Sequence, residues 1–311
     1  MPELPEVEHL RRSLEPVVVG ALVRSVRIAR RDVISTTKRR PSATELEQSL
    51  LVGGRIVATL RKGKQMALES DSGRVLVVQL GMTGSVTIEQ GPAPTGMDGK
   101  HRHVVWELVT ATGSGPGASV RMAFRDPRRF GGLTVHPARA DLERAWSELG
   151  PDGLTILGDE LALRLKGSRR PVKSALLDQT VVAGVGNIYA DESLFASSIH
   201  PLHRADRLVP HQIERLADEI RRILNQAADA GGSTLRDYRD AFGQPGDAVQ
   251  HHAAYGRADE PCLRCGTALR GIRLQGRATV FCPCCQHLST KLKAVSGTKR
   301  RSQKRPPRSG P

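Results

Sequence analysis

The stretch from Cys262 to Cys285, CLRCGTALRGIRLQGRATVFCPCC, contains all five cysteines of this 311-residue chain. Two residues separate Cys262 from Cys265 and Cys282 from Cys285, and sixteen residues lie between the two pairs. Each pair can supply two thiolates from one tight turn, and the segment between them has the length of a β-hairpin. The spacing predicts a zinc-finger hairpin that binds one structural Zn²⁺ ion. Because four protein ligands leave no open position, the metal contributes folding energy to a hairpin with little core of its own.

Cys284 exceeds the four thiolates that tetrahedral zinc requires. We interpret it as a bystander, and an exchange of ligands between Cys284 and Cys285 is the less favoured alternative. An odd number of cysteines, in a chain whose N-terminus lacks a secretory signal, favours metal binding in a reducing compartment over a disulfide framework. No apolar run reaches the roughly 18 residues of a membrane helix, so we expect a cytoplasmic protein with no membrane contact.

The charge of the chain favours a polyanionic partner. Lys and Arg number 47 against 32 Asp and Glu, and eight of the 47 lie in residues 289–311, so residues 1–288 retain 39 − 32 = +7. The segment 288–311 has too few apolar residues to form a core, and we predict a disordered basic tail. This tail either tethers a polyanion through salt-sensitive contacts or is only a solubilising end. Four cations in and after the hairpin suit phosphate contact as a group, although each alone is as consistent with a solvated surface: Arg270, Arg273, Arg277 and Lys291.

Residues 150–245 are predicted to form a helical domain. Helical spacing or composition marks the segments 173–182, 188–197, 210–230 and 234–240. The run GVGN at 184–187 separates the first two segments, as a glycine-rich turn does in a helix–turn–helix unit. A loop-like stretch over 243–252 then leads to the cysteine hairpin, which we assign to residues 250–287.

Residues 1–140 are predicted to form a helix followed by an antiparallel β-sandwich or barrel. Val7, Leu10 and Leu14 recur at helical spacing within 3–19, and Gly20 offers a stop. Short, Val-rich runs separated by Gly or polar turns follow at 55–60, 65–69, 75–80, 85–88, 103–109, 120–124 and 133–135. Two stretches rich in Gly and Pro, 90–99 and 111–119, are predicted to be exposed loops. The fold class is therefore α+β, with an N-terminal antiparallel β-sandwich, a helical domain and a zinc-finger hairpin.

The first eight residues, MPELPEVE, have two interpretations. Physical arguments alone favour an acidic, proline-started helix N-terminus, which the helix dipole stabilises. The alternative is catalytic, because removal of Met1 would leave Pro2 with a secondary amine, and an α-amine with a pKa of about 8 is partly unprotonated near neutral pH. Such an amine can attack the anomeric carbon of a sugar and form an iminium, with Glu3 beside it as a proton donor.

Motifs in a fixed order along the chain decide between these interpretations. After PELPEVE at 2–8 come RKGK at 61–64, LGMTGS at 80–85, DPRRFG at 126–131, VGNIYADESLF at 185–195, GGSTL at 231–235, YGR at 255–257 and the four cysteines. Together they resemble the bacterial formamidopyrimidine-DNA glycosylase family over roughly residues 2–287. The resemblance implies a β-sandwich catalytic domain, a helix–two-turns–helix DNA-binding domain and a zinc finger. It also implies a nucleoid-associated monomer that acts on double-stranded DNA containing oxidised bases.

The resemblance implies a bifunctional enzyme of base excision repair, which excises oxidised purines such as 8-oxoguanine and formamidopyrimidines and then cleaves the abasic site. Pro2 would displace the base and form a Schiff base, and β,δ-elimination would follow without a redox cofactor. Glu3 would assist opening of the sugar ring, and Lys64 would bind the phosphate next to the lesion. Glu6 occupies the place of a supporting carboxylate.

Five further positions match family residues that contact DNA. Met82, Arg128 and Phe130 would fill the gap left by an extruded nucleotide and so offset the few kcal/mol of lost stacking and pairing. Asn187, at the turn between helices, and Arg277, in the zinc hairpin, would hold backbone phosphates. Taken singly, Met82 and Phe130 are more typical of core residues, and Asn187 of a helix cap. Only the shared order of the motifs favours the DNA-binding roles.

Residues 101–103 depart from the family, which commonly has His-Asp-His where this chain has His-Arg-His. The exchange indicates a changed loop or an additional phosphate contact by Arg102, and His101 remains a candidate DNA-binding residue. Two alternatives stay open beside the oxidised-purine enzyme. An endonuclease VIII-like enzyme of oxidised pyrimidines is disfavoured by Leu4 and by the gap-filling set. A DNA-binding paralogue without activity is disfavoured by the joint presence of the three catalytic candidates.

Overall fold

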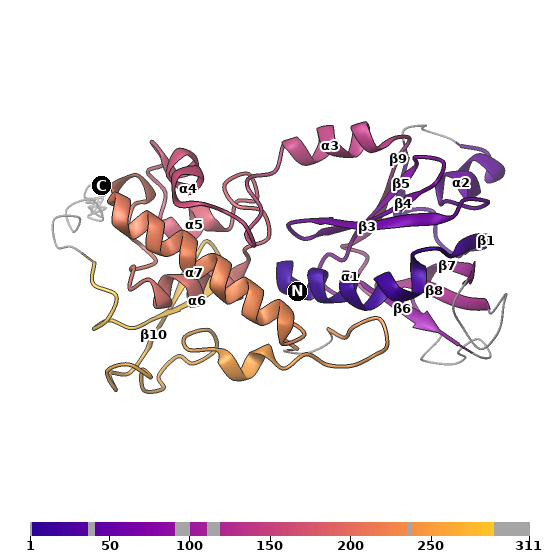
Figure 1. Cartoon of the computed structure of the whole chain (residues 1–311). Coiled ribbons are helices and arrows are strands. Elements are labelled where there is room, and N and C mark those ends of the chain that lie inside the picture. The colour runs from indigo at the N-terminus through magenta and orange to yellow at the C-terminus, as the bar shows by residue number, and fades with distance from the viewer. Residues whose placement is uncertain (1, 37–40, 91–99, 111–118, 235–237, 289–311) are drawn as a thin grey trace, which may run out of the picture.

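The computed structural model describes residues 2–36, 41–90, 100–110, 119–234 and 238–288 of the chain. Figure 1 shows two lobes, a β-rich N-terminal lobe and a mainly helical C-terminal lobe, with the start of the chain between them. Of the loops predicted over 90–99 and 111–119, residues 91–99 and 111–118 lie outside the described residues, as does the basic tail from 289 onward, whereas Ser119 begins a strand. Within the described part of the chain, no helix is long and apolar enough to cross a membrane.

The N-terminal lobe is a sandwich of two β-sheets. One sheet has the strand order β1-β7-β8-β6 and the other β2-β9-β5-β4-β3, and the strands pair antiparallel except for β2 with β9. The strands are β1 (Leu22–Ile28), β2 (Ile34–Ser35), β3 (Ile56–Lys62), β4 (Gln65–Ser70), β5 (Val75–Gln79), β6 (Ser85–Glu89), β7 (Arg102–Val109), β8 (Ser119–Arg125) and β9 (Gly132–His136). The predicted antiparallel sandwich is confirmed.

Each of the seven runs predicted as strands contains a strand, whereas β1, β2 and the short helix α2 (Ala43–Ser49) were not predicted. β1 pairs with β7 through a register shift between Val23 and Ser25. Such a bulge inserts one extra residue and breaks the alternation of buried and exposed side chains that reveals a strand in sequence. Arg24 and Arg27 interrupt the apolar residues of β1 further.

Helix α1 (Leu4–Val18) joins the cores of the two lobes. Val7, Leu10 and Leu14 lie in the core of the sandwich, as their helical spacing predicted. Leu4, one turn earlier, packs instead in the core of the C-terminal lobe. The first turn of α1 therefore lies where the lobes meet, and this turn places the beginning of the chain there.

The C-terminal lobe contains helices around one apolar core. Helix α3 (Arg139–Ser147), which packs on the sandwich, leads to α4 (Gly158–Leu165), α5 (Val172–Leu176), α6 (Asn187–Ala196) and α7 (Pro210–Asp229), with the short turns η1 (Ala205–Arg207) and η2 (Ala248–His251). α6 and α7 confirm the helices predicted at 188–197 and 210–230.

Two helix predictions in this lobe are wrong in part. The helix predicted over 173–182 ends at Leu176, because the Asp178 carboxylate accepts hydrogen bonds from the amide and hydroxyl of Thr180 and stabilises a turn. The segment predicted at 234–240 is not helical at 234 and 238–240, and 235–237 lie outside the described residues. There the Asp240 carboxylate accepts the amides of residues 242 and 244, which again favours a turn.

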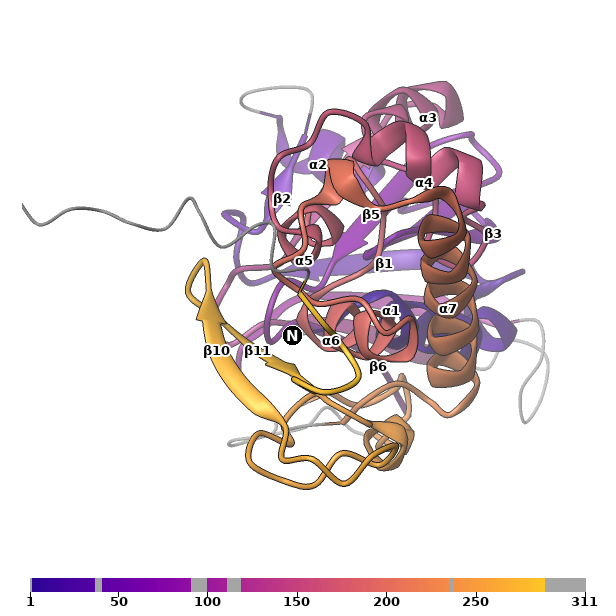
Figure 2. The same cartoon turned by 90° about the vertical axis from the view of Figure 1, so that its left-hand side faces the viewer.

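A β-hairpin follows the helical lobe, as the cysteine spacing predicted. β10 (Arg270–Leu274) pairs with β11 (Arg277–Phe281), and Gln275 and Gly276 form the turn with φ angles of 49° and 77°. Positive φ at both positions matches the twist of paired strands. Figure 2 shows the hairpin beside α6.

Candidate active site

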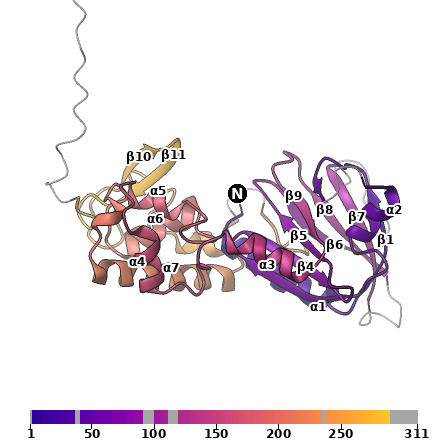
Figure 3. The same cartoon turned by 90° about the horizontal axis from the view of Figure 1, so that it is seen from above.

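Pro2 lies at the junction of the two lobes, where Figure 3 shows the N-terminus from above. The residue is buried, and the amide of Leu4 donates to the carbonyl of Gly184 at 3.2 Å. Gly184 has a φ of +109°, and a Cβ there would lie 2.2 Å from the Leu4 side chain, so α1 can dock only against glycine. Met1 lies outside the described residues, and its removal stays a prediction.

The Glu3 carboxylate lies at the N-terminus of α6. Its oxygens accept hydrogen bonds from the amides of Ile188 (3.0 Å) and Tyr189 (3.5 Å), and the residue is only 2% exposed. These amides and the positive end of the helix dipole stabilise a negative charge at this point. Gly186 makes the approach possible, because a Cβ there would lie 2.2 Å from the Glu3 carboxyl carbon. The predicted catalytic acid thus contacts the glycine-rich turn of the second lobe.

Glu6 is the centre of a buried hydrogen-bond cluster. One carboxylate oxygen accepts from the amide of Glu3 (2.7 Å), and the other accepts from the Tyr189 hydroxyl (2.7 Å) and the Ser233 amide (2.7 Å). Burial and the negative charge of Glu3 raise the pKa of Glu6 above its ordinary value, although these hydrogen bonds act in the opposite direction. Through its hydrogen bond with the Glu3 amide, Glu6 therefore fixes the backbone next to Pro2.

Lys64 stands at the turn between β3 and β4 and is half-buried. Burial lowers the pKa of Lys64, the Glu3 carboxylate acts to raise it, and the Arg277 guanidinium lowers it. The charged groups that affect Lys64 therefore come from the N-terminus and from the zinc hairpin. Gly63 allows the turn to pack closely against the other lobe, because a Cβ at this position would lie 2.9 Å from the Ala183 side chain.

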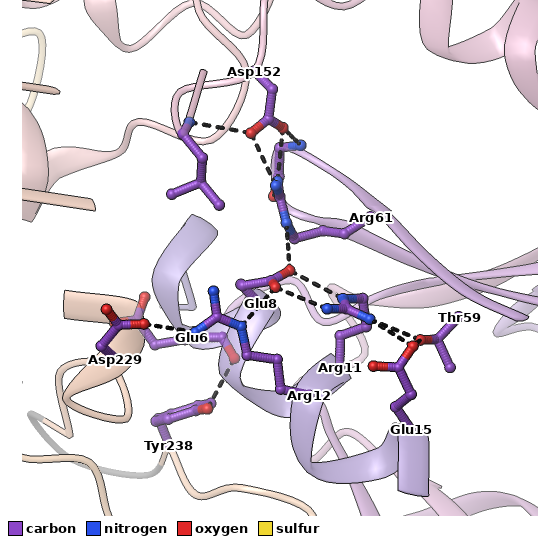
Figure 4. Close-up of polar contacts among 12 residues, drawn as sticks. Glu6, Glu8, Arg11, Arg12, Glu15, Thr59, Arg61, Asp152, Asp229 and Tyr238 are labelled. Atoms are coloured by element: carbon purple, nitrogen blue, oxygen red, sulfur yellow. Dashed lines mark hydrogen bonds and ion pairs between the residues drawn. The ribbon is translucent and has the colours of Figure 1, made fainter. Parts of the chain in front are cut away.

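An ion-pair network holds this turn against the C-terminal lobe (Figure 4). Asp152 binds both terminal nitrogens of Arg61 (2.7 and 2.9 Å) and the amide of Gly63 (2.8 Å). Arg61 also donates to Glu8 of α1 at 2.9 Å. The Arg61 and Asp152 side chains are 9% and 17% exposed, so their pair is shielded from solvent. The segment that carries Lys64 is therefore fixed to both α1 and the second lobe.

Met82, Arg128 and Phe130 stand on two adjoining loops of the sandwich. Gly81 packs so closely that a Cβ there would lie 2.4 Å from the Phe130 carbonyl carbon. The Arg128 guanidinium lies 4.6 Å from the centre of the Phe130 ring, and Asp126 accepts the amide of Arg128 at 3.2 Å. Met82 is 40% and Phe130 57% exposed, so their alternative interpretation as core residues is wrong. Two apolar side chains and a cation are instead presented at the surface.

His101 lies beside the Arg128 loop. Its carbonyl accepts the amide of Asp126 at 3.2 Å, and the exposed residue has a left-handed φ of 63°. Together with Arg30 and Arg129 it lines a pocket of about 400 Å³. The predicted DNA-binding candidate is therefore placed at a basic hollow next to the gap-filling set.

Arg102 points into the lobe. Its side chain is 4% exposed and forms an ion pair with Glu89. Arg102 also lines the pocket beside His101, but its guanidinium is paired with Glu89, so the additional phosphate contact stays a prediction that this pairing disfavours. The next residue, His103, is also turned inward, and its Nε2 hydrogen-bonds the carbonyl of Asp126 at 2.7 Å.

Asn187 lies next to the zinc hairpin. Its amide donates to the carbonyl of Ala278 at 3.1 Å, and the Lys173 ammonium donates to the same carbonyl at 2.9 Å. Asp191 pairs with Lys173 at 2.7 Å and accepts a β11 amide at 3.1 Å. These bonds fix the start of β11, where Arg277 is exposed, relative to α6.

Sequence reasoning missed Lys173, Asp191 and Glu192. Burial lowers the pKa of Lys173 and raises that of Asp191 to about 7, while their mutual attraction opposes both shifts. Glu192 accepts the amides of residues 253, 254 and 255 at 2.8, 3.0 and 2.7 Å, which fixes the segment before the zinc finger. The available signal was the pair of adjacent acids inside VGNIYADESLF, a run otherwise apolar enough to be buried.

The four predicted metal ligands come together in the hairpin. The Sγ atoms of Cys262, Cys265, Cys282 and Cys285 all lie within 4.8 Å of one another. The Cys262–Cys285 and Cys265–Cys282 sulfur distances of 4.0 and 3.6 Å fit the roughly 3.8 Å expected for thiolates tetrahedrally bound about 2.3 Å from one zinc ion. Cys284 is exposed and outside this group, which agrees with its interpretation as a bystander. The site suits one structural zinc.

The chain matches three protein-family models, in the order of its structural units. The formamidopyrimidine-DNA glycosylase N-terminal domain matches residues 1–133, and the formamidopyrimidine-DNA glycosylase H2TH domain matches residues 149–239. A zinc finger found in FPG and IleRS matches residues 259–288.

Relatives and solved structures cover nearly the whole described chain. The formamidopyrimidine-DNA glycosylases of Dinoroseobacter shibae and Bacillus subtilis are each 39% identical, over 92% of this chain and 100% and 99% of the relatives. A complex of Lactococcus lactis FPG with a FAPY-dG containing DNA has a TM-score of 0.79 at 30% identity. MutM in complex with carbocyclic 8-oxo-G containing DNA has a TM-score of 0.80 at 30% identity. Both structures cover 92% of this chain and 100% of their own.

Proposed function

The chain belongs to the formamidopyrimidine-DNA glycosylase family, and from this premise we propose that it is a bifunctional DNA glycosylase and abasic-site lyase of base excision repair. Its substrate is duplex DNA with an oxidised purine, such as 8-oxoguanine or a formamidopyrimidine. The solved relatives support this substrate class, because their complexes contain Fapy-dG, carbocyclic 8-oxo-G or abasic-site DNA. The net charge of +15 supports a polyanionic partner.

Pro2 is the proposed nucleophile once Met1 has been removed. Its neutral amine attacks C1′ of the damaged nucleotide, and the base leaves with the bonding electron pair and takes up a proton. The nitrogen then loses its proton, the C1′–O4′ bond opens to give an iminium, and Glu3 delivers a proton to O4′. The iminium acidifies C2′, so that loss of a C2′ proton expels the 3′ phosphate and a second elimination expels the 5′ phosphate.

Glu3 is suited to the acid role by its place at the N-terminus of α6. When it has given its proton away, the amides of Ile188 and Tyr189 stabilise the carboxylate that remains. Lys64, at the turn between β3 and β4, is the proposed cation for the phosphate next to the lesion. Its lowered pKa makes it more readily deprotonated than an exposed lysine.

The remaining site residues are proposed to hold the DNA. Asn187 and Arg277 contact backbone phosphates from either side of the α6–hairpin junction. Met82, Arg128 and Phe130 enter the stack in place of the extruded nucleotide, a role that their exposure and the Arg128–Phe130 contact support. A further phosphate contact is proposed for His101, from the basic hollow that it lines.

One observation carries the proposal: the Glu3 carboxylate, next to Pro2, accepts hydrogen bonds from the amides of Ile188 and Tyr189 at the N-terminus of α6, where the two lobes meet. Borohydride trapping tests it with a duplex that contains 8-oxoguanine opposite cytosine. We expect a reduced covalent protein–DNA adduct, which Pro2→Gly diminishes and a retained Met1 abolishes. If no oxidised base or abasic site yields an adduct, the protein is a DNA-binding paralogue without catalysis.

We further propose that the protein works as a nucleoid-associated monomer in the cytoplasm. Its catalytic domain is assigned to residues 1–140, its helical domain to 150–245 and its zinc finger to 250–287. Light scattering should give the mass of one 33.7 kDa chain per duplex. Two chains on a single-lesion duplex would contradict the monomer.

A further inference from the structure

A continuous hydrogen-bond chain leads from the candidate active site to a separate cavity. The Tyr189 hydroxyl donates to Oε1 of Glu6 at 2.7 Å, the Tyr189 and Ser233 hydroxyls lie 3.0 Å apart, and Ser233 Oγ lies 2.9 Å from Nε2 of His252. Glu6 and Tyr189 are 1% exposed and Ser233 4%, so water does not reach most of the chain. At its inner end, Glu6 accepts the amide of Glu3, next to the proposed nucleophile.

The outer end of the chain opens on a cavity of about 260 Å³ between α6, α7, η2 and the zinc finger. Tyr189 and His252 both line it, whereas the proposed catalytic side chains are not among its lining residues. His252 is partly exposed, and in the described part of the chain no hydrogen bond to its Nδ1 is found. One ring nitrogen is thus committed to the buried chain, and the other is left for solvent.

The protons of this chain have two consistent arrangements. When Glu6 is a carboxylate, Tyr189 gives it its single hydroxyl proton, so Ser233 must donate to Tyr189 and His252 Nε2 must donate to Ser233. When Glu6 is protonated, all three bonds reverse and Nε2 becomes an acceptor. Passage from one arrangement to the other moves one proton along each bond and transfers one net proton between His252 and Glu6.

We propose that Glu6, Tyr189, Ser233 and His252 form a proton relay through which solvent in the cavity loads and unloads Glu6 during base excision. A proton from water or a buffer acid binds Nδ1 of His252, and the Nε2 proton passes to Ser233. The Ser233 proton passes to Tyr189, and the Tyr189 proton passes to Glu6. Only O–H and N–H bonds form and break, and the reverse sequence resets the chain. His252 is therefore a positioning residue that acts through Glu6.

The relay rests on the proposed function, in which Glu3 gives its proton to O4′. Two carboxylates that share a buried site resist being charged together. Glu6 can accordingly take up a proton as Glu3 loses one, which keeps the charge beside Pro2 constant. The other titratable groups that face Glu6 are Lys64 and Tyr238, whose hydroxyl donates to the Glu6 carbonyl at 2.8 Å.

The surroundings of His252 favour release of a proton. Burial lowers the pKa of His252, the Glu192 carboxylate acts to raise it, and the neighbouring His251 lowers it. The ring is therefore mainly neutral near pH 7 and returns a proton readily. The charged or titratable groups around it come from α6, α7, η2, the following segment and the zinc finger: Glu192, Arg222, His251, Tyr255 and Arg264.

His252→Gln and Ser233→Ala test the relay in the full-length, zinc-loaded protein. Gln keeps a hydrogen-bonding nitrogen but cannot take a proton at one atom and release it at another, and Ala removes the middle link. Single-turnover excision from an 8-oxoguanine duplex is measured across about pH 5.5 to 9 for each variant and for the double variant. We expect each single variant to lower the excision rate about ten-fold and to flatten the pH dependence of that rate. This loss is smaller than the roughly 100-fold or more expected when a group that transfers a proton directly is removed. The double variant should be no slower than either single variant, because both interrupt one chain.

His251→Gln is the matched control, since His251 is adjacent and lines the same cavity without joining the chain. It should keep an excision rate close to that of the unmodified protein and a pH dependence of the same steepness, displaced only by loss of the His251 charge near His252, and all variants should bind the duplex equally. Wild-type pH profiles in His252→Gln and Ser233→Ala, or losses that multiply in the double variant, would overturn the relay while borohydride adducts still form. Absence of adducts in the unmodified protein would instead overturn the proposed function.

Discussion

Gly186 determines how closely the Glu3 carboxylate approaches α6, since a Cβ there would lie 2.2 Å from its carboxyl carbon. We expect Gly186→Ala to displace Glu3 from the helix amides and to slow excision at least ten-fold, because small displacements of a catalytic group are costly. The folding cost should be about 1 to 3 kcal/mol, as for other overpacked sites. Single-turnover excision and thermal unfolding measure the two effects. Gly132→Ala, whose added Cβ has only the Val33 carbonyl within 4 Å, is the control, and an equal loss of rate there would contradict the expectation.

Glu8 makes the stability of the junction depend on pH. Burial alone raises the pKa of Glu8, but hydrogen bonds from Arg11 and Arg12 and the charge of Arg61 outweigh it and lower the pKa to about 2 from 4.5. A group whose folded pKa is lowered stabilises the protein above its unfolded pKa, and this contribution is lost as the pH falls through the folded value. The difference corresponds to about 3 kcal/mol as an upper bound.

The Glu8→Gln variant is therefore expected to lose up to about 3 kcal/mol of unfolding free energy at pH 7. Urea unfolding at a series of pH values measures this, and the deficit relative to the unmodified protein should shrink steadily below about pH 4.5. Glu15→Gln is the control, because Glu15 is 46% exposed and its pair with Arg11 is screened by solvent. A deficit for Glu8→Gln that stays constant with pH would show that packing, and not charge, holds the junction.

At the scale of elements, the sequence predicted the helices and strands whose geometry depends mainly on residues close together in the chain. The apolar spacing of α1 and α7 and the Cys-x2-Cys pairs of the hairpin correspond to elements whose geometry follows from neighbouring residues. β1 was missed because a bulge disturbs its alternation. Residues 238–240 were predicted as helix, but the Asp240 turn and a hydrogen bond from the Tyr238 hydroxyl to the distant Glu6 carbonyl hold them in another conformation.

The candidate site was also predicted only in part: the residues in motifs were found, and the residues that position them were not. Pro2, Glu3 and Lys64 were predicted because they stand in recognisable motifs, although their roles remain proposals. The partners that position them come from tertiary structure and leave little trace in one sequence. Neither the docking of Glu3 against Gly186 nor the pairing of Lys173 with Asp191 follows from local spacing.

The zinc hairpin is an element whose position depends on both the metal and the buried Lys173–Asp191 pair. Removal of zinc by a chelator should release the cysteine turns and displace Arg277, because the short hairpin has little core of its own. We expect duplex affinity to fall at least ten-fold, with most of the far-ultraviolet circular dichroism retained by the two lobes, and zinc to restore binding.

Cys262→Ser and Cys284→Ser separate the ligand from the bystander. Cys262→Ser should lower zinc content, measured by mass spectrometry of the native protein, and should weaken binding as chelation does. Cys284→Ser should retain one zinc per chain and normal affinity, since Cys284 is exposed and outside the ligand group. Loss of zinc in Cys284→Ser would contradict the four-ligand assignment.

At the scale of the whole molecule, the site exists only where the lobes meet. Pro2 and Glu3 immediately precede α1, Lys64 comes from the sandwich, and Arg277 comes from the zinc hairpin. α1 has apolar residues in both cores, with Leu4 in one and Val7 in the other. The relative position of the lobes therefore sets the geometry of the catalytic candidates, and contacts between lobes have consequences for chemistry as well as stability.

Asp152 connects the C-terminal lobe directly to the segment that carries Lys64, because it binds Arg61 and the amide of Gly63 in that segment. Asp152→Asn should remove one of the two carboxylates that bind the buried Arg61 guanidinium, while Glu8 remains, and should cost about 1 to 3 kcal/mol of unfolding free energy, less than full removal of a buried partner. Because the Lys64 turn loosens, excision should slow about ten-fold or more at saturating duplex, beyond any change in KM.

Asp229→Asn is the matched control for this prediction. It breaks another ion pair across the lobes, with Arg12, but Asp229 is 70% exposed and reaches Arg61 only indirectly, through Arg12 and Glu8. Its cost should stay below about 1 kcal/mol, and its excision rate should remain that of the unmodified protein. Single-turnover rates and urea unfolding of both variants decide the matter. If both variants lose rate equally, any loss of interlobe charge disturbs the site. If only Asp152→Asn loses rate, the lobes are coupled to the chemistry through the Arg61–Gly63 turn.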